Sequence, residues 1–208
     1  MKLIFDIGCN VGHWIEANLK EDVRIIGVDA HQEAYQYATQ RFKDNPNVNI
    51  LNYAVSSEDN DFVSFYKANI DWASTASLSF KDHGRFASTM KWSEPVNVAT
   101  ITLDTLIKIY GEPDYIKIDV EGYESRTLRG LTHKSGMIAF EWNEEQKIDT
   151  LLCIDHCSSL DYKEFAILEG DEYTYIPRQW DTYDSFIIMV NDFLKADRMT
   201  KWGMIYCK

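Results

Sequence analysis

The chain has 208 residues, of which 45% are hydrophobic and 26% are charged, so it is long enough and apolar enough to fold around its own core and is not a disordered chain. The longest apolar run spans residues 186–190, far short of the ~20 residues that a membrane-spanning helix needs. A net charge of −12 disfavours a primary role in binding nucleic acid, because an acidic surface repels the phosphate backbone.

The four cysteines show no spacing typical of a disulfide framework or a metal site. The first residues, MKLIFDIG, do not resemble a signal peptide, because an acidic residue interrupts the apolar stretch at once. We therefore expect a reduced, cytoplasmic protein.

Strands and helices alternate in the first third of the chain. Short apolar segments typical of buried strands are separated by segments whose apolar residues recur at helical spacing. This alternation requires crossover connections and predicts a parallel sheet with helices on both faces. The predicted strands in this part are 2–7, 24–29 and 48–55, with helices beginning near 11 and 34.

The pattern changes after residue 60. Residues 61–67 alternate as in an edge strand, and residues 68–95 lack periodicity, which is typical of a lid or a substrate-binding loop. Regular elements then return, and without a linker or repeat we expect residues 1–208 to form a single domain. The later predicted strands are 96–102, 114–119, 136–141, 164–168 and 185–190, and the later predicted helices are 103–110, 123–131 and 145–160.

A glycine-containing loop, Gly8 to Gly12, follows the first strand and opens a helix, and Asp29 ends the second strand. Glycine lets the backbone approach a ligand, a helix N-terminus favours an anionic group, and a carboxylate after the second strand can accept hydrogen bonds from a ribose. Asn10 stands where a dinucleotide fingerprint has its second glycine, and Asp6 would repel a pyrophosphate but suit an ammonium group. The loop therefore favours S-adenosylmethionine over a nicotinamide dinucleotide, and a turn that binds no ligand is the plain alternative.

Three carboxylates follow two later strands of the predicted sheet. Asp119 and Glu121 are two residues apart at the end of one strand, and Glu141 ends the next. If these strands are neighbours, the acids gather at one edge, where they could act as a general base or hold Mg²⁺ or Mn²⁺ through Asp119 and Glu141. The alternative is that they are ordinary solvated acids at strand ends and at a helix N-terminus.

Taken in order, several segments resemble the FkbM-type S-adenosylmethionine-dependent methyltransferases. The most specific of them is the segment that contains the acid pair and the leucine, arginine and glycine that follow it. The resemblance runs from about residue 3 to residue 144. The segments are DIGCNVG at 6–12, VDAHQEAY at 28–35, LDTL at 103–106, YIKIDVEGYESRTLRGL at 115–131 and FEWNE at 140–144.

The resemblance implies the class I methyltransferase fold, a Rossmann-like sheet of seven mostly parallel strands in the order 3-2-1-4-5-7-6, with an antiparallel strand from the tail. It implies an O-methyltransferase whose acceptor is a hydroxyl of a saccharide or glycan. It also places the acid pair Asp119 and Glu121 in the family's D-x-E motif. The residues implied to bind the cofactor are Asp6, Gly8, Asn10, Gly12 and Asp29, together with Tyr53 and Ala54 on the adenine side.

The chain departs from the family pattern in three places. Cys9 replaces the usual alanine, Ala30 replaces the usual proline, and the first core strand begins almost at Met1. The last departure suggests a minimal version of the domain, or a domain excised from a longer polypeptide such as a glycosyltransferase fusion. Residues 68–95 and the tail would then enclose the substrate.

Several other residues are candidates for chemistry. His83 lies in the long loop and is a second candidate base, and Trp142 and Trp180 could stack on a sugar ring, although core packing is the more usual role of tryptophan. The remaining alternatives for the whole chain are a nicotinamide-dependent oxidoreductase, a methyltransferase acting on a non-sugar small molecule, a nucleic-acid methyltransferase and a binding domain without activity. The acidic charge and the absence of an Asp/Asn-Pro-Pro segment argue against nucleic acid.

Overall fold

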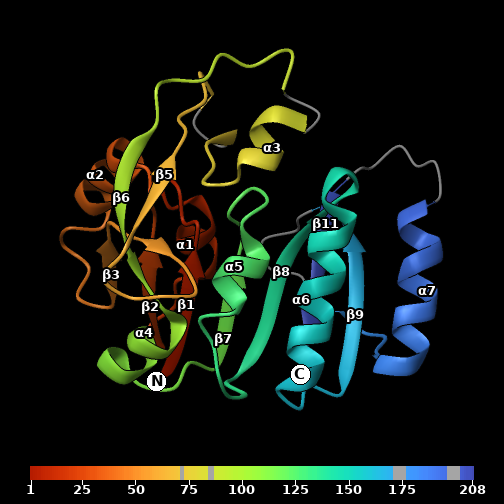
Figure 1. Ribbon diagram of the computed structural model, residues 1–208. Helices are drawn as coiled ribbons and strands as arrows, with labels where there is room; N and C mark the ends of the chain where they lie inside the picture. The colour runs from red at the N-terminus through yellow and green to blue at the C-terminus, as the bar shows by residue number, and fades with distance from the viewer. Residues whose placement is uncertain (71–72, 84–86, 171–176, 196–201) are drawn as a thin grey trace.

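A central sheet organises the fold in the computed structural model, which describes residues 1–70, 73–83, 87–170, 177–195 and 202–208 (Figure 1). The sheet has eight strands in the order β10-β9-β11-β8-β7-β1-β2-β3. The strands β3, β2, β1, β7 and β8 run parallel, whereas β11 is antiparallel to both of its neighbours and β10 to β9. Their bounds are β1 Lys2–Ile7, β2 Val23–Val28, β3 Val48–Leu51, β7 Tyr115–Ile118, β8 Met137–Asn143, β9 Glu164–Glu169, β10 Asp181–Thr182 and β11 Trp202–Cys207.

The predicted fold class is confirmed. Apart from the two-residue edge strand β10, the strand order is the expected 3-2-1-4-5-7-6, and β1 lies in the interior of the sheet. The observed sheet has one strand more than the seven expected, because β10 pairs with the outer side of β9.

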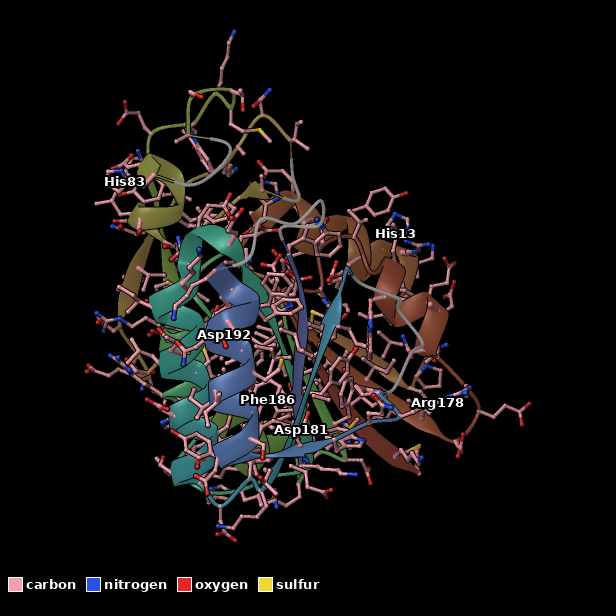
Figure 2. The ribbon with its side chains drawn as sticks, turned by 90° about the vertical axis from the view of Figure 1, so that its right-hand side faces the viewer. His13, His83, Arg178, Asp181, Phe186 and Asp192 are labelled. Carbon is pink, nitrogen blue, oxygen red and sulfur yellow. The ribbon has the colours of Figure 1, made fainter. Side chains whose placement is uncertain are left out.

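Helices cover both faces of the sheet (Figure 2). One face carries the larger apolar core, in which every second strand residue packs against four helices. The opposite face is covered by two helices through a smaller core that includes Ile15, Ala38 and Phe42. The helices of the first face are α4 Leu103–Tyr110, α5 Glu124–Leu128, α6 Lys147–Ser159 and α7 Tyr183–Lys195, and those of the second are α1 His13–Asn18 and α2 Gln32–Arg41.

A small second sheet lies beside β3. It contains β4 (Ala54–Val55), β6 (Val96–Ile101) and β5 (Phe62–Phe65), in the order β4-β6-β5. The predicted strand 48–55 is therefore divided between two sheets at Asn52. The Asn52 side chain donates to the carbonyl oxygens of Asp29 and Ala30, which holds the chain at the end of β2 where it leaves the main sheet.

The prediction of a strand near 185–190 is wrong, because these residues lie within α7. The strand antiparallel to the others is β11, which the sequence reading missed. A run of five apolar residues fits a buried strand as well as a buried helix. The spacing of four residues between Phe186, Val190 and Leu194, all buried, is what puts one helical face onto the sheet.

The predicted helix 145–160 is confirmed as a short 3-10 turn, Glu144–Gln146, followed by α6. The apolar spacing of Ile148, Leu151 and Leu152 predicts a buried face made of these residues, and the structure differs. Ile148 is 77% exposed and Leu152 is 42% exposed. The buried side chains are instead Thr150, Cys153, Ile154 and Cys157. Among the residues that the structure describes, no helix is long and apolar enough to span a membrane.

A pair of alanine substitutions tests the register of α7. Phe186 is fully buried and its ring lies 5.5 Å from that of Phe165, whereas Ile188 is 68% exposed. Phe186→Ala should lower the free energy of unfolding by about 3–5 kcal/mol, and Ile188→Ala should change it by less than about 0.5 kcal/mol. Urea denaturation measures both. Similar losses in the two variants would contradict the helix, because a strand would place both side chains on one face.

Candidate functional site

A cavity of about 1040 Å³ lies at the carboxyl ends of the parallel strands. In open α/β sheets this is the edge at which ligands bind. The glycine loop and Asp29 line one part of it, and Asp119, Glu121 and Glu141 line another. The segment predicted to be a lid contributes Asn69, Ile70, Ser74 and Ala76 to the wall, while its residues 71–72 and 84–86 lie outside the described residues.

The glycine loop passes very close to the end of β7. Gly8 has a φ of +80° and its amide donates to the carbonyl of Val28 at 2.8 Å. A Cβ on Gly8 would lie 1.8 Å from the carbonyl oxygen of Asp119, so no other residue fits there. Asn10 lines the cavity with a φ of +47°, whereas Gly12 faces Phe42 and is not part of the lining.

Asp29 connects the glycine loop to the start of α2. Its Oδ2 accepts from the amide of Asn10 at 2.6 Å, and its Oδ1 accepts from the amide of His31 at 2.8 Å. Burial raises the pKa of Asp29, and these two hydrogen bonds offset part of that effect. Each carboxylate oxygen has a second lone pair, so Asp29 can still accept hydrogen bonds from a diol in the cavity.

The wall beside Asp29 holds Tyr53, Ala54 and His31. Tyr53 is 37% exposed, and Ala54 is buried in β4. His31 is only 6% exposed, and its Nδ1 accepts from the amide of Ala34 and so caps α2. These three residues close the cavity at the end of β2 and β3.

Asp6 and Lys117 form a buried ion pair at the floor of this region. Asp6 is fully buried and is not part of the lining, whereas Lys117 lines the cavity although it is only 4% exposed. Lys117 Nζ lies 3.7 Å from Asp6 Oδ1 and 3.0 Å from Asp119 Oδ2. The sequence patterns do not predict a role for Lys117 in the site. The strand register that pairs Lys117 with Asp6 across β1 and β7 is what places it there.

The three acids do gather, as expected from neighbouring strand ends. One carboxylate oxygen each of Asp119, Glu121 and Glu141 lies within 4.8 Å of the others. Glu141 is 8% exposed and the Asp119 side chain 27%. The site therefore combines a group of carboxylates with the ammonium of Lys117.

The loop that carries Asp119 and Glu121 is held in an unusual conformation. Glu121 has a φ of +53° and Gly122 a φ of +87°. Glu124 Oε1 accepts from the amides of Val120 at 3.0 Å and Gly122 at 3.3 Å, and Thr75 Oγ1 donates to the carbonyl of Glu121 at 2.7 Å. These bonds stabilise a backbone conformation that a non-glycine residue rarely adopts.

Burial raises the pKa of Glu124 to about 8, and the nearby carboxylate of Asp149 adds to the increase. Asp149 sits on α6, accepts from the amide and hydroxyl of Ser125, and has a raised pKa for the same main reason, burial. Cys153 of α6 is fully buried beside this pair. Glu124, which holds the loop of Asp119 and Glu121 in place, therefore changes its protonation state near pH 8.

Three other candidates lie away from the cavity lining. His83 is exposed at the end of α3 (Leu78–His83), on the outer side of the molecule in Figure 2. Trp142 is 2% exposed and its Nε1 donates to the carbonyl of Leu168, and Trp180 Nε1 donates to the carbonyl of Pro177. The structure therefore does not bring these side chains to the acids.

A family model described as the methyltransferase FkbM domain matches residues 6–175. That range covers most of the chain and includes the glycine loop and the acid loop. The chain belongs to the FkbM methyltransferase family. The resemblance seen in the sequence is thereby confirmed, and the protein carries a methyltransferase domain of this family.

Three solved structures with a similar backbone illustrate the fold, and two of them are methyltransferases by name. Fibrillarin from Aeropyrum pernix, in complex with S-adenosyl-L-methionine, has a TM-score of 0.49 and 10% identity over 100% of this FkbM chain and 66% of its own, slightly less than two thirds. Precorrin-6y C5,15-methyltransferase from Geobacter metallireducens has a TM-score of 0.44 and 11% identity, and the match covers 100% of this chain and 78% of the other. A methyltransferase from Archaeoglobus fulgidus has a TM-score of 0.45 and 14% identity, and the match covers 100% of this chain and 86% of the other. At these values the likeness says nothing about the acceptor of the FkbM protein, and a search of the curated proteins gives no match.

Glu124 should make the stability of the FkbM protein depend on pH. Between its ordinary pKa near 4.5 and its folded pKa of about 8, the folded state holds a proton that the unfolded state has lost. The free energy of unfolding should therefore fall as the pH rises through this window, by at most ~1.4 kcal/mol per pH unit.

Glu124→Gln keeps the accepting oxygen and removes the titration. Its free energy of unfolding should fall less steeply than that of the wild type between pH 5 and pH 8, as measured by chemical denaturation. The matched control is Glu58→Gln at an exposed position, which should retain the wild-type slope. If Glu124→Gln also retains that slope, another group is responsible.

Proposed function

We propose that this methyltransferase binds S-adenosylmethionine along the glycine loop and Asp29, and transfers a methyl group to a hydroxyl of a saccharide or glycan at the acid end of the same cavity. The observation that supports this most directly is the continuity of the cavity. One volume of about 1040 Å³ is lined by both groups of residues. It slightly exceeds the upper end of the range of about 300–1,000 Å³ that is usual for ligand sites, which leaves space for a second substrate.

At the cofactor end, each residue has a distinct proposed role. Asp29 accepts hydrogen bonds from the ribose hydroxyls, Gly8 and Asn10 contact the methionine portion, and Tyr53 and Ala54 adjoin the adenine. Gly12 shapes the turn into α1 without lining the cavity. Asp6 acts through Lys117, because it is buried behind the lining and pairs with the lysine.

At the acid end, Asp119 is the proposed general base, assisted by Glu121. A saccharide hydroxyl is a weak nucleophile at neutral pH and needs its proton accepted as its oxygen attacks. Lys117 Nζ occupies one oxygen of Asp119 at 3.0 Å, so the other is the one that would accept the proton. Bound S-adenosylmethionine would supply the methyl group and take up the electron pair of the broken sulfur–carbon bond. His83 is the weaker candidate because it does not line the cavity.

A divalent cation is the alternative way to activate the hydroxyl. The donor set suits one, because three carboxylate oxygens lie within 4.8 Å of one another, and Mg²⁺ and Mn²⁺ prefer oxygen ligands. Asp119 and Glu141 would hold it. The ammonium of Lys117, however, already places a positive charge beside Asp119. We therefore favour the carboxylate as base and treat the metal as an outcome of the test.

The family match favours methyl transfer over the nicotinamide-dependent oxidoreductase that the sequence left open. A non-sugar small molecule stays the alternative acceptor. A cytoplasmic location and an association with a glycosyltransferase stay predictions.

Asp29→Ala should weaken S-adenosylmethionine binding, because it removes two charge-assisted hydrogen bonds worth about 1.5–3 kcal/mol each. Calorimetry should show an increase in Kd of at least about a hundredfold. Since Asp29 also accepts from the amides of Asn10 and His31, thermal denaturation must show that the variant folds. Asp44→Ala, at an exposed position, is the matched control. Unchanged affinity in a folded Asp29→Ala variant would remove this residue from the cofactor site.

Asp119→Asn should lower kcat by about 10²–10⁴ with little change in S-adenosylmethionine affinity, because it keeps the shape of the base and removes its charge. Activity is measured by mass spectrometry of a saccharide library, with Asp22→Asn, an exposed substitution, as the control. Near-normal turnover of the Asn variant would assign the chemistry to another residue. The same assay with EDTA separates the two routes. Loss of turnover that Mg²⁺ or Mn²⁺ restores would make the acids metal ligands. Full turnover in EDTA would leave a carboxylate or His83 as the base, and the loss of activity in Asp119→Asn would then assign that role to Asp119.

A further inference from the structure

We propose that Trp202 is the platform on which the acceptor sugar stacks, so that the enzyme selects a pyranose with an exposed apolar face and no anionic substituent. This inference rests on the proposed function and names the acceptor more closely. It moves the role of a stacking aromatic from Trp142 and Trp180 to a tryptophan that the sequence reading did not single out.

The first support is the position of the indole. Trp202 is the first residue of β11, lines the cavity, and is 38% exposed. Trp142, one residue out of phase on the neighbouring strand, is 2% exposed and packs edge-to-face against Phe193 on the other face of the sheet. A large apolar ring that stays open to a ligand cavity, while its neighbour is buried, is suited to contact a ligand.

The strand register then places Trp202 on the face of the acids. Trp202 pairs with Asn143, and Met204 pairs with Glu141, in the antiparallel ladder between β11 and β8. Paired residues point to the same face, as do residues two apart on one strand, so Trp202 and Glu141 are diagonal neighbours on one face. Such neighbours have Cβ atoms about 7–8 Å apart or less, a distance that an indole ring can span.

The backbone holds Trp202 firmly although its ring is exposed. Its carbonyl accepts from the amide of Gly170 at 2.9 Å. A Cβ on the next residue, Gly203, would lie 2.0 Å from the carbonyl of Leu168 and 2.8 Å from Trp142 Nε1. The backbone of Trp202 is therefore already held in place before a ligand binds. This reduces the conformational entropy that is lost on binding.

The charges of the cavity define the class of acceptor. Asp119, Glu121 and Glu141 accept hydrogen bonds when ionised, and the ammonium of Lys117 already faces Asp6 and Asp119. Hydroxyl groups can donate to these carboxylates, whereas a carboxylate or phosphate on the sugar would be repelled by them. A pyranose offers both features at once, hydroxyls at its edge for the acids and C–H groups on its face for the indole.

The test labels the six tryptophans of the intact protein with 5-fluorotryptophan and follows them by ¹⁹F NMR in the presence of S-adenosylhomocysteine. The Trp202 signal is assigned with Trp202→Phe, and the Trp180 signal, from a ring outside the cavity lining, is an internal control. Neutral methyl pyranosides should shift the Trp202 signal and leave that of Trp180 in place. The corresponding methyl uronides should do so only at concentrations at least tenfold higher. The inference is overturned if no neutral pyranoside shifts the Trp202 signal, or if the uronides shift it equally well.

Kinetics with the best acceptor from the library give the second readout. Trp202→Ala should raise KM for that acceptor about tenfold or more with kcat nearly unchanged, because stacking stabilises the bound substrate and the transition state alike. Trp202→Phe should remain within about threefold of the wild type. Unchanged S-adenosylmethionine affinity shows that both variants fold. An unchanged KM in Trp202→Ala on a confirmed sugar acceptor would refute the platform and leave the proposed function intact, whereas an acceptor that is not a sugar would refute the proposed function itself.

Discussion

The contact between Gly8 and the carbonyl of Asp119 is the constraint on which the site depends. Both backbones are tied to their neighbours at this point, because the amide of Gly8 donates to Val28 and that of Asp119 donates to Ile7. A single methyl group at Gly8 would force the two loops apart, since it would lie 1.8 Å from the Asp119 oxygen. The spacing between the proposed cofactor loop and the acid loop is thus set by backbone packing rather than by flexible side chains.

The acid loop transmits this constraint to the substrate side. The left-handed conformations of Glu121 and Gly122 are stabilised by hydrogen bonds on both sides of the chain. The Glu124 carboxylate accepts from backbone amides of the loop, and the Thr75 hydroxyl donates to the carbonyl of Glu121. Phe80 of α3 packs closely against Gly122. A Cβ added to Gly122 would lie 3.0 Å from the Cβ of Phe80. The segment 73–83, which contributes Ser74 and Ala76 to the cavity wall, is therefore attached to the loop that holds the proposed base.

Much of this architecture could be predicted from the sequence, because local rules determine it. The alternation of the first five elements, the glycine loop and the acids at the ends of neighbouring strands follow from periodicity and from the geometry of parallel sheets. The assignment of 185–190 as a strand failed because a short apolar run does not distinguish helix from strand. Lys117 and Trp202 were missed for a different reason. Their significance depends on cross-strand register, with Asp6 for one and Glu141 for the other, and register involves residues far apart in the sequence.

The two faces of the sheet are covered differently, and this difference explains the position of the cavity. On one face, long helices such as α6 and α7 bury a continuous apolar layer from Phe5 to Ile205. On the other, α1 is a helix of only six residues. On this second face a polar row lies toward the carboxyl ends of the parallel strands. It contains Asp6 and its partner Lys117, and then Glu141, which lies two residues beyond Ala139, the partner of Lys117 on β8. Trp202 is the diagonal neighbour of Glu141 on β11. Burying such a row under an apolar helix would leave charged groups without water or adequate partners. The charges are tolerated because Lys117 and Glu141 line the cavity, where they can meet a ligand, and because the buried Asp6 pairs with Lys117.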